Sequence, residues 1–95
     1  MNNQQLAIYL IQEQIRNQVL IIALENLGFD CSSYTLNISE IILSLIGINE
    51  KPDSLYQHYF ELIEKAVEET NYCNIDEKLI EWSKTIYVEL NNNSS

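Results

Sequence analysis

His58 and Glu61 are the two side chains best spaced for metal or acid–base chemistry. They lie three residues apart, so a helix would place both on one face. This order reverses the Glu-x-x-His pairs that hold iron in carboxylate-bridged helical bundles. Such a site needs matching ligands on neighbouring helices, and His58 is the single histidine of the chain. We therefore interpret His58 as a surface imidazole beside a carboxylate, and we expect no metal and no cofactor.

The two cysteines, Cys31 and Cys73, are the candidate nucleophiles. A catalytic thiol needs a nearby base and electropositive surroundings. Asp30 precedes Cys31, and Cys73 lies in an acidic stretch, so both thiols are expected to stay protonated. Two free thiols are also the ordinary state in a reducing compartment. The sequence therefore predicts no catalytic residue and a protein that is not an enzyme.

The charge balance excludes several partners. The 95 residues carry 14 acidic and 5 basic side chains, for a formal net charge of −9. Nucleic-acid binding needs clustered Lys or Arg, whereas these are scattered, so no direct nucleic-acid contact is expected. The apolar run 19–24 is far shorter than the roughly 20 residues that span a bilayer. The polar residues at 2–5 include no basic residue before the first apolar stretch, so the charge pattern of a secretory signal is missing. We therefore expect no membrane span and a cytoplasmic protein.

The scarcity of turn residues favours helices over short strands. The chain has only two glycines and one proline. Each glycine follows an apolar periodic segment, where a left-handed residue ends many helices. The pattern predicts helices over 3–27, 37–46, 53–70 and 74–90, with a disordered polar tail at 91–95.

Two pairs with the spacing of a capping box set the expected helix starts. Asn37 with Glu40, and Asn74 with Glu77, each place an amide three residues before a carboxylate. Residues 29–36 are accordingly expected to be a loop, with Phe29 and Tyr34 folded back onto the core.

The first helix has two apolar sides. Its β-branched side chains fit one narrow arc, and most of its leucines lie roughly opposite. Five residues of this size left in water would forgo about 10 kcal/mol, so something must cover them. We expect a homodimer, although burial by the chain's own second and fourth helices is the alternative. The predicted dimer interface consists of Ile8, Ile11, Ile15, Val19 and Ile22.

The third segment carries an acidic ridge made of Glu61, Glu64 and Glu68. Such a ridge is ordinarily a solvated helix face. It would also attract a cationic partner, and it is the predicted partner-binding surface.

Aromatic residues lie on the other side of that segment. Tyr56, Tyr59 and Phe60 share the apolar phase of Leu55 and Leu62. We interpret them, together with Trp82 of the fourth segment, as core residues and not as a stacking platform.

The predicted fold class is all-α: a single helical domain over 1–90, built as a small four-helix bundle-like domain with long first, third and fourth helices and a short second helix. The third and fourth helices are expected to pair antiparallel. The predicted function is a non-enzymatic, self-associating protein-protein interaction or regulatory module. The alternative is an acidic inhibitor or immunity-type protein that neutralises a basic protein partner.

Overall fold

The protein is described by a computed structural model that covers residues 1–48, 52–69 and 76–93. These ranges contain four helices and no strand: α1 (Asn3–Asn26), α2 (Ser32–Ile46), α3 (Asp53–Glu69) and α4 (Asp76–Asn93). The predicted all-α, four-helix bundle-like fold is confirmed. No helix in the described ranges is long and apolar enough to cross a membrane.

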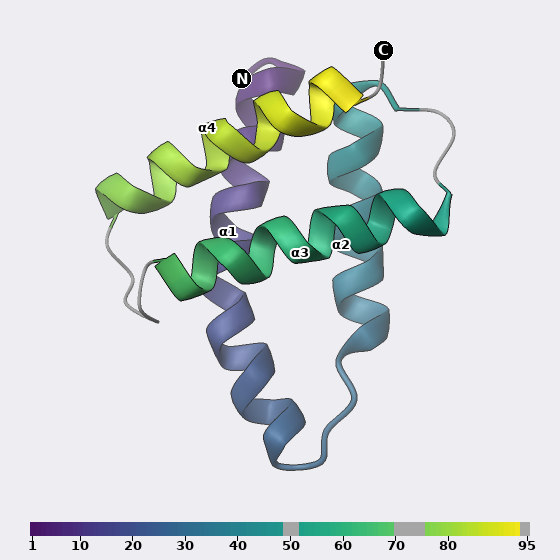
Figure 1. Cartoon of the computed structure of the whole chain (residues 1–95), viewed down its shortest axis with the longest axis vertical. Helices are drawn as coiled ribbons and strands as arrows, with labels where there is room; N and C mark the ends of the chain where they lie inside the picture. Colours follow the sequence, from purple (N-terminus) through teal and green to yellow (C-terminus); the bar gives the residue numbers. More distant parts are fainter. Residues whose placement is uncertain (49–51, 70–75, 94–95) are drawn as a thin grey trace.

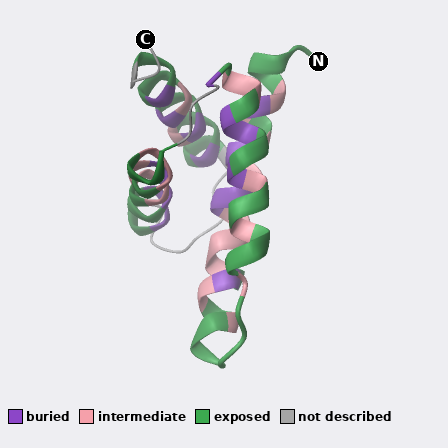
Figure 2. Cartoon of the chain, turned by 90° about the vertical axis from the view of Figure 1, so that its right-hand side faces the viewer, coloured by how far each residue is buried: buried purple, intermediate pink, exposed green. Residues whose placement is uncertain are grey.

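The helices form two crossed layers around α1. Figure 1 shows α1 and α2 running antiparallel, with α3 and α4 lying across them. The view from the side shows the joined ends of α1 and α2 projecting beyond the second layer (Figure 2). α1 packs against all three other helices, whereas α3 and α4 contact each other less than each contacts α1. The bundle is therefore organised by α1 and not by an α3–α4 pair.

Hydrogen bonds at the helix ends explain where α1 and α2 stop. Gly28 and Gly47 have φ values of 99° and 98°, a left-handed conformation that costs glycine little. The Phe29 amide donates to the Leu24 carbonyl, and the Ile48 amide donates to the Leu43 carbonyl, each at 3.1 Å. These are the bonds of a Schellman motif. Both predicted helix stops are confirmed.

The predicted start of α2 was wrong. Asn37 lies in the second turn of the helix and is exposed. The helix begins at Ser32 because the Asp30 carboxylate accepts two hydrogen bonds there, one from the Ser32 amide at 3.0 Å and one from the Ser32 hydroxyl at 2.7 Å. These two bonds hold the pKa of Asp30 below its usual value. α2 is thus one turn longer than expected.

The outer helices agree more closely with the sequence. α3 begins at Asp53 as predicted and is described to Glu69, and Thr70, the expected last residue, lies outside the described residues. α4 begins at Asp76, and the proposed cap Asn74 lies outside the described residues. α4 also continues through Asn93, so the first three residues of the expected tail are helical.

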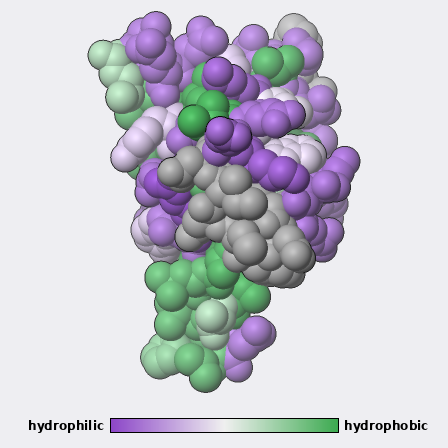
Figure 3. Space-filling view, turned by 90° about the vertical axis from the view of Figure 1, so that its left-hand side faces the viewer, coloured by the Kyte–Doolittle hydropathy of each residue, from purple (hydrophilic) through white to green (hydrophobic). Residues whose placement is uncertain are grey.

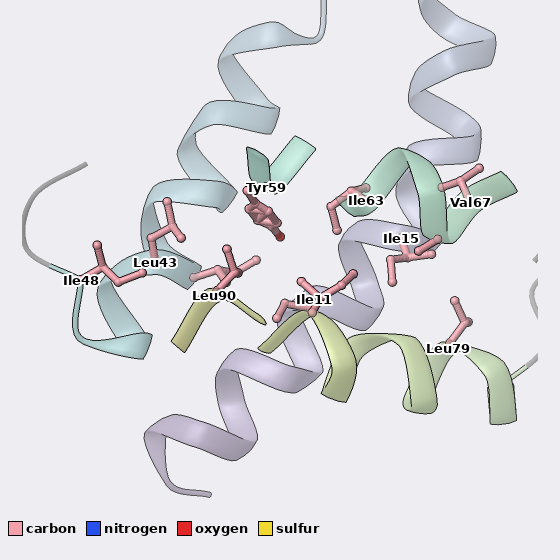
Figure 4. Packing of buried hydrophobic residues seen from close by; sticks show 12 residues of the cluster. Ile11, Ile15, Leu43, Ile48, Tyr59, Ile63, Val67, Leu79 and Leu90 are labelled. Carbon is pink, nitrogen blue, oxygen red and sulfur yellow. The ribbon is translucent and has the colours of Figure 1, made fainter. Parts of the chain in front are cut away.

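The hydrophobic core draws on every helix. Tyr59 and Ile63 of α3 lie above α1, flanked by Leu79 and Leu90 of α4 (Figure 4). Ile48, which follows the end of α2, is also buried, whereas Phe29 at the equivalent place after α1 is 61% exposed. Tyr34 is also exposed, at 49%, so the expectation that Phe29 and Tyr34 fold back onto the core was wrong. The buried cluster consists of Ile11, Ile15, Ile42, Leu43, Ile48, Tyr59, Ile63, Ala66, Val67, Leu79, Ile86 and Leu90.

A chain of polar side chains crosses this core. The Tyr59 hydroxyl donates to Gln14 Oε1, and Gln14 Nε2 donates to Ser39 Oγ at 3.3 Å. Ser39 Oγ in turn donates to the Thr35 carbonyl at 2.8 Å. All three side chains are buried, and burial raises the pKa of Tyr59 well above its usual value. The neutral hydroxyl is therefore kept as a donor, and it joins α3 to α1 and α2.

We predict that Tyr59→Phe lowers the free energy of unfolding by about 1 to 3 kcal/mol, because Gln14 Oε1 is left buried without a donor. Urea unfolding followed by far-UV circular dichroism measures this loss. Tyr87→Phe, at a half-buried tyrosine of the fourth helix outside this network, is the control and should stay within about 0.5 kcal/mol of the parent. The double variant Tyr59→Phe with Gln14→Leu should recover part of the loss, since Ser39 keeps its own acceptor. Parent-like stability of Tyr59→Phe would contradict the role given to this bond.

Candidate protein-binding groove

An open groove of about 740 Å³ runs between α2 and α3. α2 contributes three residues and α3 contributes the other six. On each helix the contributing residues recur every three or four positions, which places them on one face. The lining consists of Leu36, Asn37, Glu40, Asp53, Tyr56, Gln57, Phe60, Glu61 and Glu64.

The groove has an aromatic floor and an acidic rim. Tyr56 and Phe60 are half-buried, so each presents part of its ring to the groove. Glu40, Asp53, Glu61 and Glu64 are exposed around them. No Lys, Arg or His is among the described residues that line the groove. An apolar floor with carboxylates on both sides favours a ligand that is itself apolar and positively charged.

The electrostatic effect of the rim is felt by Tyr56. Partial loss of hydration raises the pKa of this phenol, and the nearby carboxylates of Glu40 and Asp53 raise it further. Both carboxylates raise the pKa because ionisation would place the negative charge of the phenolate near them. The same field favours a cation placed over the ring.

The structure divides the predicted acidic ridge. Glu61 and Glu64 line the groove, whereas Glu68 is exposed on α3 and is not part of the lining. Glu40 and Asp53, the other two acidic groups of the rim, were not predicted as partner-binding residues from the sequence. Their placement depends on which face of α2 meets α3, and the mistaken start of α2 concealed that face.

The aromatic residues of α3 are also divided. Tyr59 is fully buried, which confirms its predicted core position. Tyr56 and Phe60 pack partly against the core and partly line the groove. Helical spacing alone does not separate a core residue from one at the border of a groove, because the two lie within about one turn of each other.

His58 lies away from the groove, at the contact between α3 and α4. Its Nε2 atom is 3.6 Å from Glu89 Oε1, and both side chains are half-exposed. Nε2 itself is buried and has no hydrogen-bond partner. The predicted imidazole beside a carboxylate is thus present, but the carboxylate belongs to α4. The described part of the chain holds no group of three or more His, Cys, Asp or Glu side chains placed to bind a metal.

Of the two cysteines, only Cys31 lies in the described part of the chain. Cys31 is a half-buried free thiol beside the start of α2. Cys73 lies outside the described residues.

The five residues of the predicted dimer interface face the protein's own core to different extents. Ile11 and Ile15 are fully enclosed by their own chain, with exposed fractions of 0% and 2%. Ile8, Val19 and Ile22 are half-buried. The premise that all five would otherwise remain in water therefore does not hold, since α1 is covered on this side by three helices of the same chain. Ile11 and Ile15 have no surface to offer a second chain.

We predict that Glu40→Gln lowers the pKa of Tyr56, because it removes one of the negative charges that oppose ionisation of the phenol. An NMR titration of the tyrosine ring carbons measures the shift. Glu25→Gln, at an exposed carboxylate outside the groove, should leave the Tyr56 titration unchanged. An unmoved Tyr56 in Glu40→Gln would show that α2 and α3 do not meet as described.

Comparison with known proteins adds no relative. No family model, curated protein or solved structure matches this chain. What the chain does is therefore inferred from its own side chains, and the α2–α3 groove is the candidate binding surface.

Proposed function

We propose that the chain is a non-enzymatic, cytoplasmic interaction or regulatory module that holds a cationic segment of another protein in the α2–α3 groove. One observation carries the proposal. Four carboxylates from two helices surround two half-buried aromatic rings, with no basic side chain among the described lining residues. The non-enzymatic part of the proposal rests on the sequence, which predicts no catalytic residue.

The dimensions of the groove suit a short amphipathic helix. Its α3 side extends from Asp53 to Glu64, which is about 17 Å of helix at 1.5 Å per residue. Three turns of a partner helix would cover that length, with apolar side chains over Tyr56 and Phe60 and basic side chains beside the rim. The rim charges then contribute to encounter rate and selectivity, and the aromatic floor contributes to affinity.

An inhibitor or immunity-type role is one form of the same proposal. A protein that neutralises a basic partner needs an acidic surface with defined shape, and the groove supplies both the charge and the shape. Glu61 and Glu64 keep the partner-binding role expected of them. The proposed contact adds Glu40 and Asp53 on the facing side.

Self-association remains part of the proposal. The surface cannot include Ile11 and Ile15 as they are placed, because both are enclosed by the bundle. Homodimer formation through another face would leave the α2–α3 groove open to a different partner.

The proposal predicts that a synthetic helical peptide, with leucines on one side and lysines on the other, binds the protein and is released by salt. Reversing both rim charges with Glu61→Lys and Glu64→Lys should weaken binding about tenfold or more. Titration calorimetry at low and at physiological salt measures both effects.

A matched control lies on the same helix. Glu68→Lys changes the net charge in the same direction, but the residue does not line the groove, so it should weaken binding only slightly. Equal loss in Glu64→Lys and Glu68→Lys would mean that net charge alone attracts the peptide. No binding by the parent protein at low salt would also contradict the proposal.

A further inference from the structure

The outer side of α1 carries a second surface, which we name the α1 outer strip. Its residues are spaced four, three, four, three and four apart, the spacing by which one helix packs along another. Three large apolar side chains of this strip are strongly exposed, at 48% for Tyr9, 61% for Leu20 and 75% for Leu27. The strip consists of Tyr9, Glu13, Arg16, Leu20, Ala23 and Leu27.

The strip lies directly opposite the buried side of α1. The buried residues Ala7, Ile11, Gln14, Ile15 and Ile21 define the inner face. At about 100° per residue, the strip falls on the other side of the helix. Figure 3 shows apolar side chains gathered over the end of the molecule formed by the α1–α2 hairpin. On this face Tyr9, Leu20, Ala23 and Leu27 are exposed, whereas Glu13 and Arg16 are half-buried.

The apolar area is large enough for association. Phe29 and Tyr34, at the α1–α2 end, are 61% and 49% exposed and extend the strip. With about 200 Å² for a fully exposed side chain of this size, the five large residues expose about 600 Å². A standard protein interface buries about 800 Å² per partner, including its polar rim. The strip and its rim together therefore approach what a stable dimer needs.

The distribution of charge indicates which partner fits. The net charge of −9 makes most of the surface repel a second copy. α1 and α2 are the least charged helices: α1 has Glu13, Glu25 and Arg16, the single arginine of the chain, and α2 has Glu40 alone. Within the strip itself, Glu13 and Arg16 balance and form an ion pair of 3.0 Å.

We propose that the α1 outer strip binds a second copy of this chain, with the two α1 helices antiparallel about a twofold axis. If the axis passes beside residue 18, Tyr9 of each chain faces Leu27 of the other, Glu13 faces Ala23, and Arg16 faces Leu20. The pairing is isologous, so it closes at two chains. All six residues of the strip then meet a counterpart, and the exposed apolar side chains of the two strips cover each other.

This inference supplies the surface for the proposed self-association, and it is independent of peptide capture in the α2–α3 groove. The groove is lined by residues of α2 and α3, whereas the strip lies on α1. A protein that binds the cationic peptide as a monomer would refute the dimer and keep the groove. A dimer that does not bind the peptide would do the reverse.

Sedimentation equilibrium over a concentration series tests the proposal. The parent protein should approach a mass of twice 11.1 kDa. Leu20→Glu should raise the dimer dissociation constant about tenfold or more and leave the circular dichroism spectrum unchanged, because Leu20 is exposed in the single chain. Val88→Glu, at a 54% exposed residue of α4, is the control and should dimerise like the parent.

An introduced charge pair tests the antiparallel arrangement. Tyr9→Lys and Leu27→Glu should each weaken the dimer, since each places a charge against an apolar side chain of the second copy. The double variant should restore it. A parent protein of 11.1 kDa at every concentration overturns the proposal, and so does a Leu20→Glu variant that dimerises like the parent. Failure of the double variant to recover the dimer would overturn the pairing of Tyr9 with Leu27.

Discussion

The buried amide of Gln14 is the constraint on which the arrangement of this small bundle depends. It accepts a hydrogen bond from Tyr59 of α3 and donates one to Ser39 of α2. A buried polar group without its partners is costly, so a rotation of α1 that moved Gln14 away would leave Tyr59 without its acceptor. Hydrophobic burial alone tolerates such a rotation, because α1 is apolar on both sides.

The rotation of α1 decides which surfaces remain for partners. With Gln14 turned inward, its neighbours Ile11 and Ile15 join the core, and Leu20 and Leu27 are left outside. The same bonds hold α2 and α3 against α1 and so support the groove between them. The proposed dimer surface and the proposed peptide groove are therefore consequences of one buried network, although they lie on different faces.

Much of the fold could be predicted from sequence because its signals are local. Gly28 and Gly47 end helices through their left-handed conformation, and the single apolar side of α3 faces the core as expected. The start of α2 was missed because Asp30 caps through a short turn, while the pair Asn37 and Glu40 has the more familiar spacing.

The rotation of α1 and the full set of groove residues could not be predicted from the sequence pattern. A helix with two apolar sides gives no preference for the side that turns inward, and the hydrogen bonds of Gln14 connect residues 25 and 45 positions apart. Among the acidic residues of the groove, Glu61 and Glu64 were predicted from the sequence as partner-binding residues. Glu40 joins Asp53, Glu61 and Glu64 around the groove only after α2 and α3 have each packed against α1.

The most direct test of this account is whether Tyr59 ionises in the folded protein. An NMR titration with tyrosine ring carbons labelled would follow Tyr59 to alkaline pH. Because burial raises the pKa of Tyr59, stability should fall as the pH rises above the usual tyrosine pKa of about 10. The account predicts that the Tyr59 signal stays that of the neutral phenol until the chain unfolds. Ionisation of Tyr59 near pH 10, with the helices intact, would contradict the buried bond to Gln14 and the orientation of α1 that depends on it.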